Sequence, residues 1–477
     1  MFKKEAIIIY ASVLYALLTL YFVWQDQAYF SLASIGLLAI YFAIFYTEWT
    51  FLSLAFLTPI SVNIEEYTKS FGLFIPTEPM LFGIMLLLVL QQLKSRILPK
   101  EIWKNPIIIA VGFYLLWIFI TSITSTHVLP SLKFLLARLW FIVPVLLFGT
   151  IAFKKEVNVK AFIWLYCSGM MIAMIYTVFT HAGYAFGEKE SHWVMWPFFK
   201  DHTIYGCMVA FIVPLTFGLY FSKKHTPLVQ AILIIYIVVT LIALYFSYTR
   251  AAWLSVFAAV GVWGLLHFKI KFSLIASIVG FIAVTLFFSW DAIQIEMARN
   301  KSEHTTEDFG ERLQSATNVT TDASNLERLN RWSCAISMFE ARPVFGFGPG
   351  TYAFEYARFQ EPENLTIIST SNGDGGNAHS EYLGPMAEMG FMGLISVLFI
   401  IAAIFYKGIT LYNNWPIEEK EMRIIILSMI LALVTYYVHA VLNNFLDTDK
   451  AAVPIWAFCA SFVALEIQLN KKNLTQK

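Results

Sequence analysis

His379 is the residue of this chain best suited to acid–base chemistry. It lies in the stretch NAHSEY (377–382), directly before a long apolar segment. A histidine among polar neighbours at the mouth of a helical bundle can act as a general base near neutral pH. The structural alternative is an imidazole that is hydrogen-bonded to backbone at the start of a helix. Glu381, Glu388 and several glycines follow within the same segment, and they favour a functional role.

Arginines are the second group of candidates, because a guanidinium group pairs with phosphate through two hydrogen bonds and keeps its charge in a low dielectric. Arg250 ends the apolar stretch LIALYFSYTR, and Arg138 lies inside another, FLLARLWFIVPV. Either side chain can instead extend to lipid headgroups. Arg328 and Arg331 lie in RLNRWSCAISMFEARP, a stretch that predicts an amphipathic helix with both guanidinium groups on one face. Together these arginines suit a diphosphate ligand.

Glycines and a polar pair accompany these candidates. Gly346, Gly348 and Gly350 permit φ > 0 and a close approach of backbone to a ligand. The stretch GFGPG is therefore either a turn that ends the preceding helix or a loop that faces a phosphate. It matches neither a P-loop nor a dinucleotide-binding fingerprint. His439 and Asn443, four residues apart, predict a polar network on one helix face, with substrate contact as the alternative.

Neither metal ligands nor disulfides are indicated by the sequence. Asp447 and Asp449 have no third ligand at a fixed spacing, so we predict no metal site. No pair of cysteines has the CxxC spacing that is typical of zinc or redox sites. The cysteines are Cys167, Cys207, Cys334 and Cys459.

The composition shows what kind of molecule must position these residues. Of the 477 residues, 58% are hydrophobic and only 14% are charged, against about 25% charged in soluble globular proteins. The mean hydropathy is +0.65. The formal net charge of +1 gives no electrostatic reason for a nucleic-acid partner. This composition excludes a soluble cytosolic enzyme and predicts a polytopic membrane protein.

Apolar runs long enough to cross a bilayer, about 20 residues each, fill almost the whole chain. We therefore predict an all-α integral membrane bundle with about 12–14 transmembrane helices. The run at 48–63 is short and is alternatively re-entrant. The predicted spans are 6–24, 28–47, 48–63, 77–94, 105–125, 130–152, 161–182, 203–222, 227–247, 251–267, 272–290, 383–406, 422–443 and 451–469.

The charges of the loops predict the orientation. Lysines and arginines gather on one side of the predicted spans, for example at 94–104, 154–160 and 471–477, and the positive-inside rule assigns that side to the cytoplasm. Both termini are then cytoplasmic, and the long hydrophilic loop 291–382 lies on the opposite face. Ser, Thr and Asn near 314–325 indicate a flexible connector, whereas aromatic residues and glycines in the second half of the loop indicate order.

In this order and on this one face, the candidate residues resemble the O-antigen ligase and polymerase superfamily of bacterial envelope glycan enzymes. The dipeptide HS at His379, followed after nine residues by GFMG, resembles the ligases' histidine, small polar residue and GxxG pair. The stretch that begins at Arg328 and runs into GFGPGTY is similar to the upstream part of the family signature. The stretch SYTR, which ends at Arg250, looks like the family's arginine before the large outer loop.

The resemblance covers about 247–406 and divides the chain into three regions. Residues 1–246 are N-terminal transmembrane helices, 247–406 are the O-antigen-ligase-like region with the periplasmic loop 291–382, and 407–477 are C-terminal transmembrane helices with a cytoplasmic tail. The resemblance implies a helical enzyme of the bacterial inner membrane, with its active site on the periplasmic face. It also implies that neither a metal nor a nucleotide cofactor is needed.

The reaction that the resemblance implies is transfer of a glycan from an undecaprenyl diphosphate carrier to an acceptor. The acceptor is a sugar of the lipid A–core in the ligases, another glycan chain in the polymerases and a protein hydroxyl in the O-oligosaccharyltransferases. The spacing after His379 favours the ligase. A lipid-linked glycan transporter is the rival class, but transporters place their site near the midplane between repeated halves. Here the polar residues cluster on one outer face.

Residue chemistry and resemblance together give a hypothesis for catalysis. His379, as the base, would take the proton of the acceptor hydroxyl. Arg250 and Arg328, joined by Arg138, would hold the diphosphate and stabilise the charge of the leaving group. The other substrate-binding candidates are Arg331, Gly346, Gly348, Gly350, Ser380, His439 and Asn443.

Overall fold

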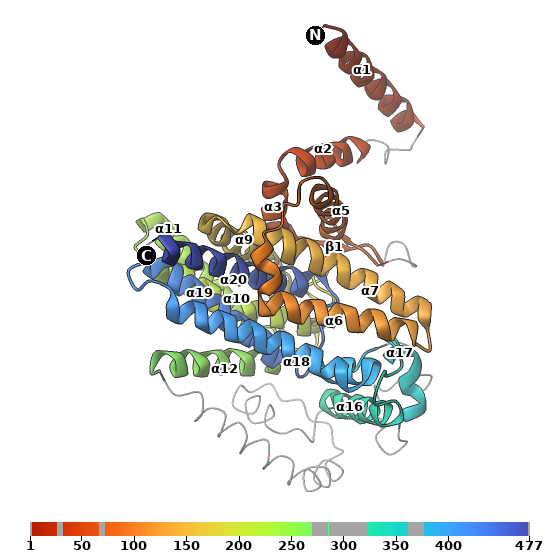
Figure 1. The fold of residues 1–477 in the computed structure, drawn as a ribbon, viewed down its shortest axis with the longest axis vertical. Helices are drawn as coiled ribbons and strands as arrows, with labels where there is room; N and C mark the ends of the chain where they lie inside the picture. The colour runs from red at the N-terminus through yellow and green to blue at the C-terminus, as the bar shows by residue number, and fades with distance from the viewer. Residues whose placement is uncertain are drawn as a thin grey trace.

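A bundle of long helices makes up most of the chain in the computed structural model (Figure 1). The structure describes residues 2–25, 32–65, 72–269, 285, 323–360 and 376–475. A short antiparallel sheet pairs β1 (Val62–Asn63) with β2 (Phe74–Ile75), in a register that places Val62 opposite Ile75. Apart from this sheet, the elements of the described residues are helices, as predicted.

Nine helical segments of the described residues are long and apolar enough to cross a membrane. They confirm that the protein is an all-α polytopic membrane protein. The predicted span 272–290 lies almost entirely outside the described residues. The nine segments are α6 (Pro106–Ile123), the run of α7 (Val128–Ile142), the π-helix η3 (Val143–Phe148) and α8 (Gly149–Ala152), α9 (Glu156–Ala182), α10 (His202–Ser222), α11 (Pro227–Tyr245), α12 (Arg250–His267), α18 (Leu383–Asn414), α19 (Lys420–His439) and α20 (Asp449–Thr475).

Two of the N-terminal helices are too short to cross a bilayer alone. α2 (Leu32–Phe45) and α3 (Thr47–Ile60) have 14 residues each, against about 20 for a full crossing. They lie where the sequence predicts the spans 28–47 and 48–63. The described residues before 100 also include the helices α1 (Phe2–Trp24) and α5 (Thr77–Ser95).

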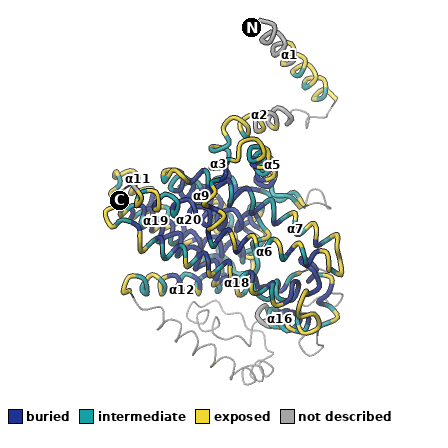
Figure 2. Tube along the Cα trace, viewed as in Figure 1, coloured by how far each residue is buried: buried dark blue, intermediate teal, exposed yellow. Residues whose placement is uncertain are grey.

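Three helices form the buried centre of the bundle. The buried share of the apolar span is 78% in α10, 72% in α19 and 83% in α20. It is only 22% in α11 and 17% in α12. Figure 2 shows the same division between a buried interior and more exposed outer helices. A polar residue on a central helix therefore faces protein rather than lipid, which lowers the cost of placing it in a membrane.

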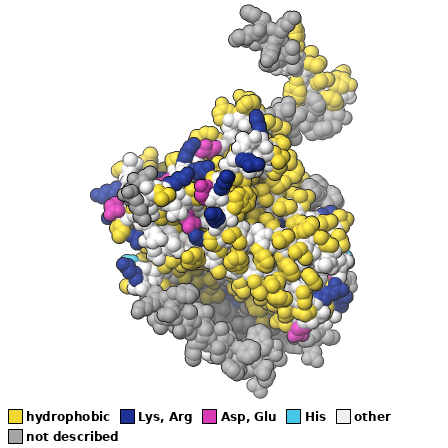
Figure 3. Space-filling model, in the orientation of Figure 1, with side chains coloured by type: hydrophobic (Ala, Val, Ile, Leu, Met, Phe, Trp, Pro, Cys, Tyr) yellow, Lys and Arg dark blue, Asp and Glu magenta, His cyan; other side chains and the backbone are white. Residues whose placement is uncertain are grey.

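The charged side chains of the bundle are unevenly distributed between its two ends. Figure 3 shows hydrophobic side chains over much of the visible face, and Lys, Arg, Asp and Glu side chains gathered toward the end that carries the C-terminus. There Lys472 Nζ lies 3.0 Å from Glu419 Oε1, and Lys223 Nζ lies 2.9 Å from Glu421 Oε1. We call this the lysine end. The opposite end carries α16 (Ala323–Ala341), and we call it the α16 end.

α16 confirms the amphipathic helix that was predicted from residue 328, and it begins earlier, at Ala323. It packs on α18 through a small second core that includes Cys334, Met338 and Tyr356. Two short helices follow, α17 (Tyr352–Glu355) and the 3-10 helix η5 (Tyr356–Phe359). The predicted flexible connector near 314–325 lies almost entirely outside the described residues.

α18 is kinked near its start by Gly390, which has φ +68° and ψ −166°. The kink makes room for the chain that follows α16, because the Phe391 N–H donates to the Pro343 carbonyl (2.9 Å). A Cβ atom at Gly390 would collide with the backbone carbonyl of Val344. The first glycine of the GFMG stretch is therefore required for this close approach of two backbones.

Candidate active site

The segment 376–382 brings His379 to the α16 end of the bundle. The backbone of His379 is left-handed (φ +47°), and its N–H donates to Asn377 Oδ1 (3.0 Å). Ser380 is buried, and its hydroxyl caps α18 by accepting two backbone N–H groups of the first turn (3.2 and 3.3 Å). The imidazole of His379 makes no hydrogen bond to any described residue. It therefore serves neither as a cap nor as a link to backbone, and it remains available to a ligand.

α16 holds this segment in place through Arg331. Arg331 is buried, with its Nε 2.8 Å from Glu327 Oε1. Its Nη1 donates to the Asn377 carbonyl (3.2 Å), and its guanidinium lies 5.0 Å from the centre of the Tyr356 ring. These contacts engage Arg331 with the protein itself, so its side chain fixes the position of the loop that carries His379.

His379 is uncharged at neutral pH. Burial, and then the positive charges of Arg331 and Arg328, lower its pKa to about 4. The neutral imidazole can accept a proton. The charge of Arg328 also acts on His439 and His202. Arg328 therefore acts electrostatically on three histidines of the α16 end.

His439 and Asn443 are in contact, as their spacing predicts, but they do not share a helix. α19 ends at His439, and Asn443 lies in the connecting segment that follows. Both residues are buried, with His439 Nε2 and Asn443 Nδ2 3.1 Å apart. His439 Nδ1 is buried and has no hydrogen-bond partner among the described residues. The end of α19 thus presents a polar atom without a partner among the described residues, on a ring that feels the charge of Arg328.

Arg138 is enclosed by the bundle and does not extend to the membrane surface. It lies on α7, is 8% exposed, and has its guanidinium 4.7 Å from the centre of the Phe134 ring. It makes no hydrogen bond to any described residue, and its Nε is fully buried. Its charge acts on Glu381 and Asp447 without forming an ion pair among the described residues. A buried guanidinium without hydrogen bonds is costly, so this geometry favours an anionic ligand.

Glu381, two residues after His379, anchors the segment between α19 and α20. Its Oε1 accepts the Tyr436 hydroxyl (2.9 Å) and the N–H groups of Phe445 and Leu446 (2.8 Å each). Burial raises the pKa of Glu381, whereas the charge of Arg138 lowers it. Through Glu381, the start of α18 and the end of α19 form one connected polar cluster.

Arg250 is the first residue of α12 and follows a tight turn. Within this turn Tyr248 has φ +51°, which is uncommon for a residue other than glycine. The Thr249 hydroxyl donates to the His202 carbonyl (2.8 Å), which joins the start of α12 to the start of α10. A Cβ atom at Gly206 would lie only 2.6 Å from Thr249 Cβ, so the two segments are in direct contact. Arg250 therefore lies at the α16 end beside the first turn of α10.

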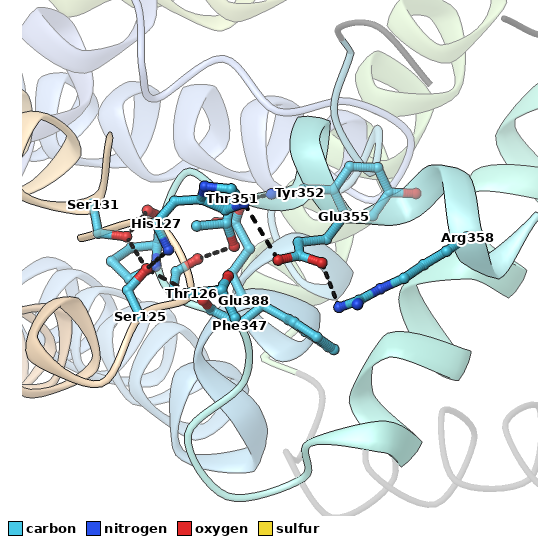
Figure 4. A network of polar contacts seen from close by, with 12 residues as sticks. Ser125, Thr126, His127, Ser131, Phe347, Thr351, Tyr352, Glu355, Arg358 and Glu388 are labelled. Atoms are coloured by element: carbon cyan, nitrogen blue, oxygen red, sulfur yellow. Dashed lines mark hydrogen bonds and ion pairs between the residues drawn. The ribbon is translucent and has the colours of Figure 1, made fainter. Parts of the chain in front are cut away.

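The GFGPG stretch is closed around a carboxylate of the protein itself (Figure 4). Gly346, Gly348 and Gly350 have φ values of +65°, +114° and +74°. Glu388 Oε2 accepts the Gly350 N–H and Oε1 accepts the Tyr352 N–H, both at 2.9 Å. The Gly348 N–H donates to the backbone carbonyl of Glu388 (2.7 Å). These N–H groups are occupied, so the stretch is a turn around Glu388 in this structure.

A second set of polar residues supports the other side of this turn, and the sequence analysis missed it. The Ser131 hydroxyl on α7 donates to the Pro349 carbonyl (2.8 Å). His127 Nε2 lies 3.5 Å from Glu355 Oε1, and Glu355 also pairs with Arg358 (Figure 4). Ser131 and Pro349 are 218 residues apart in the chain, and His127 and Glu355 are similarly distant. A serine or histidine beside an apolar run carries no signal of such a distant contact.

The two aspartates considered as metal ligands belong to different surroundings. Asp449 is buried at the start of α20, where its Oδ2 accepts the Ser61 hydroxyl (2.5 Å). The adjacent Lys450 Nζ donates to the carbonyls of Thr58 and Ser61 (2.7 Å each). Within the described ranges, no group of three or more His, Cys, Asp or Glu side chains is placed to hold a metal ion.

The fold and the site define a multi-pass helical membrane protein with a histidine and arginines gathered at one end of its bundle. Residues 235–398 match a family model described as O-antigen ligase. This match confirms the resemblance to the O-antigen ligase superfamily, and it supports a glycan ligase or polymerase type of function, that is, a glycosyltransferase-like enzyme. The matched residues include His379, Arg250 and Arg328 but neither Arg138 nor His439. A search of curated proteins found no match to the chain.

Proposed function

We propose that this protein transfers a glycan from an undecaprenyl-diphosphate-linked donor to a sugar of the lipid A–core at the periplasmic face of the inner membrane. The observation that carries the proposal is a neutral His379 beside Arg328, with no hydrogen bond to any described residue. The family match over the same residues supports it. The positive-inside rule assigns the lysine end to the cytoplasm, which assigns the α16 end to the periplasm.

In the proposed reaction, His379 accepts the proton of the acceptor hydroxyl as its oxygen attacks the anomeric carbon of the donor sugar. A bond forms between that oxygen and the anomeric carbon. The bond between the same carbon and the diphosphate oxygen breaks, and the lipid diphosphate leaves with the electron pair. This direct displacement inverts the configuration at the anomeric carbon.

The arginines stabilise the negative charge that develops on the departing diphosphate. Arg250 and Arg328 bind the two phosphates, because guanidinium groups match phosphate oxygens in geometry and charge. Arg138 supplies a further positive charge from within the bundle, where it lacks hydrogen bonds to described residues. A bound diphosphate would give this guanidinium the hydrogen-bond acceptors that it lacks among the described residues.

The remaining candidate residues divide into two roles. Arg331 and Ser380 are engaged with backbone and with Glu327, so we assign them to positioning His379. The glycine stretch 346–350 has the same role, because Glu388 occupies its N–H groups. His439 and Asn443, buried near Arg328, stay substrate-contact residues in this proposal.

The test is glycan transfer in a cell whose own O-antigen ligase is deleted. The variants are His379→Ala and Arg250→Ala, and the readout is polymer on lipid A–core at equal protein levels. Removal of a general base or of a transition-state cation lowers a rate by about a hundredfold or more. We therefore expect wild type to restore the lipopolysaccharide ladder and both variants to lose it.

Matched controls come from the lysine end. His225 Nε2 lies 2.8 Å from the Leu219 carbonyl, and Arg423 lies over the Tyr412 ring. His225→Ala and Arg423→Ala should keep the ladder. Longer carrier-linked chains would instead identify a polymerase, and glycan on protein an oligosaccharyltransferase. If none of these products forms while lipid-linked glycan crosses the membrane only with this protein present, the protein is a transporter.

A further inference from the structure

His202 is a polar residue at the α16 end that neither the residue motifs nor the proposed reaction uses. Its Nδ1 is buried and has no hydrogen-bond partner among the described residues. The other ring nitrogen, Nε2, makes no hydrogen bond to the described residues either. The ring as a whole is partly buried, but a buried ring nitrogen without a partner is costly, and such an atom at a candidate active site points to a missing ligand.

The position of His202 is fixed by strong local contacts. Asp201 caps α10, with Oδ1 accepting the N–H groups of Thr203 (2.8 Å) and Ile204 (3.1 Å). The carbonyl of His202 accepts the hydroxyl of Thr249, the residue directly before Arg250. The imidazole therefore sits on a rigid helix start that is tied to the turn carrying Arg250.

The surroundings of His202 define the chemistry of the group it would meet. Its ring packs against the ring of His192, with centroids 4.1 Å apart and planes at 62°. The charge of Arg328 acts on His202, and His202 in turn acts on His439. The carboxylate of Asp201 also acts on His202, but it already accepts the N–H groups of Thr203 and Ile204. Arg250 directly follows Thr249, whose hydroxyl contacts the His202 carbonyl. Arg250 and Arg328 therefore favour an anionic ligand that accepts hydrogen bonds, such as a phosphate.

We propose that His202 donates a hydrogen bond to the diphosphate of the lipid-linked donor, between Arg250 and Arg328. This inference rests on the proposed function. It adds a substrate-contacting residue on α10, which lies outside the region 235–398 that matches the family model. The site for the lipid-linked substrate is then formed by α10, α12 and α16 together. α10 contributes the neutral N–H group of His202, whereas α12 and α16 contribute the charged arginines.

The test measures binding of farnesyl diphosphate, a short prenyl diphosphate, to the full-length protein in detergent. His202→Phe keeps a ring against His192 but removes the donor, and His202→Gln keeps an N–H donor. A hydrogen bond to a charged group lost from a buried site weakens binding by about tenfold or more. We expect His202→Phe to raise Kd by this factor and His202→Gln to raise it less.

His192→Phe is the matched control, because His192 shares the ring contact but is not assigned to the ligand. It should bind like wild type. If His192→Phe weakens binding as much as His202→Phe, the effect is one of packing and the inference is wrong. The inference is also wrong if His202→Phe binds like wild type while Arg250→Ala and Arg328→Ala bind weakly, although the proposed function then stands. If wild type does not bind the diphosphate at all, the proposed function fails as well.

Discussion

At the scale of single residues, the central feature is a histidine whose surroundings keep it neutral. Burial and two nearby arginines lower the pKa of His379 to about 4, below the value near 6.5 of an unperturbed histidine. A general base works in its deprotonated form. Because the folded protein keeps His379 deprotonated well below pH 6.5, its contribution to the rate is complete throughout the neutral range and is lost only in acid.

This pKa predicts the pH dependence of transfer. The initial rate of purified enzyme should be unaffected by His379 between about pH 6 and pH 8, and it should fall as the pH approaches about 4. A fall centred near pH 6.5 would contradict the effect of burial and of the arginines. The measurement is the rate of glycan transfer in detergent across this range, with circular dichroism at each pH to exclude unfolding.

The double variant Glu327→Gln, Arg331→Gln tests the cause of this shift. It removes the positive charge beside His379 and also its buried partner, so that no unpaired carboxylate remains. Arg331 lowers the pKa of His379 more than Glu327 raises it, so the pKa should rise, and the acidic fall in rate should move to higher pH. Because burial is the largest cause and Arg328 remains, the pKa should stay below 6.5. An unchanged profile would contradict a net contribution of this ion pair to the shift.

At the scale of elements, the kinked start of α18 and the glycine turn form one unit. Gly346 has φ +65°, and a Cβ atom there would collide with the backbone carbonyl of Glu388. Gly384, in the first turn of α18, would place its Cβ 3.8 Å from Ala378 Cβ, an ordinary contact. The two glycines therefore differ in what they can tolerate although they lie close together in the fold.

This difference predicts opposite results for two alanine substitutions. Gly346→Ala should destabilise the protein by at least 1 kcal/mol or so, about the cost of forcing φ > 0 on a side chain, and the collision adds to it. Gly384→Ala should be neutral or slightly stabilising, because alanine is the better helix former. Thermal unfolding in detergent, followed by fluorescence-detected size-exclusion chromatography, compares them. Equal melting temperatures would show that the turn is not held as described.

At the scale of the whole molecule, the uneven charge of the two ends predicts the orientation in the membrane. All four cysteines are buried, so introduced cysteines can be labelled selectively. Arg342 is exposed near the α16 end and Lys224 is exposed at the lysine end. In intact spheroplasts a membrane-impermeant maleimide should label Arg342→Cys but not Lys224→Cys. Permeabilised cells should allow both to react, and the reverse pattern in intact cells would invert the proposed topology.

The division of the chain into the regions 1–246, 247–406 and 407–477 stays a prediction. The polar cluster draws residues from all three of them. Arg138 lies on α7, His379 precedes α18, and His439 ends α19. Glu381 and Tyr436 link the second region to the third through a hydrogen bond of 2.9 Å. Residues from all three regions therefore contribute to this site.

From the order of amino acids alone, we could predict the class of molecule, most of the spans and the residue types of the site. The length of an apolar segment and the charge of a loop are local properties of the chain. They indicate a polytopic helical bundle without any knowledge of how the helices pack. The amphipathic stretch from Arg328 likewise predicted α16, because helical periodicity is read from neighbouring residues. The short helices α2 and α3 show the limit of this reasoning, since a run of apolar residues does not show where a helix breaks.

The partners of these residues, in contrast, depend on the three-dimensional fold. The glycine stretch looked able to face a phosphate, and Glu388 occupies it from 38 residues away. Asn443 lies beyond the helix that its spacing predicted, yet it still meets His439. His202 carried no motif, and the contact of the Thr249 hydroxyl with its carbonyl, across 47 residues, ties it to the turn before Arg250. Such contacts depend on how helices pack in three dimensions, and spacing along the chain does not encode that arrangement.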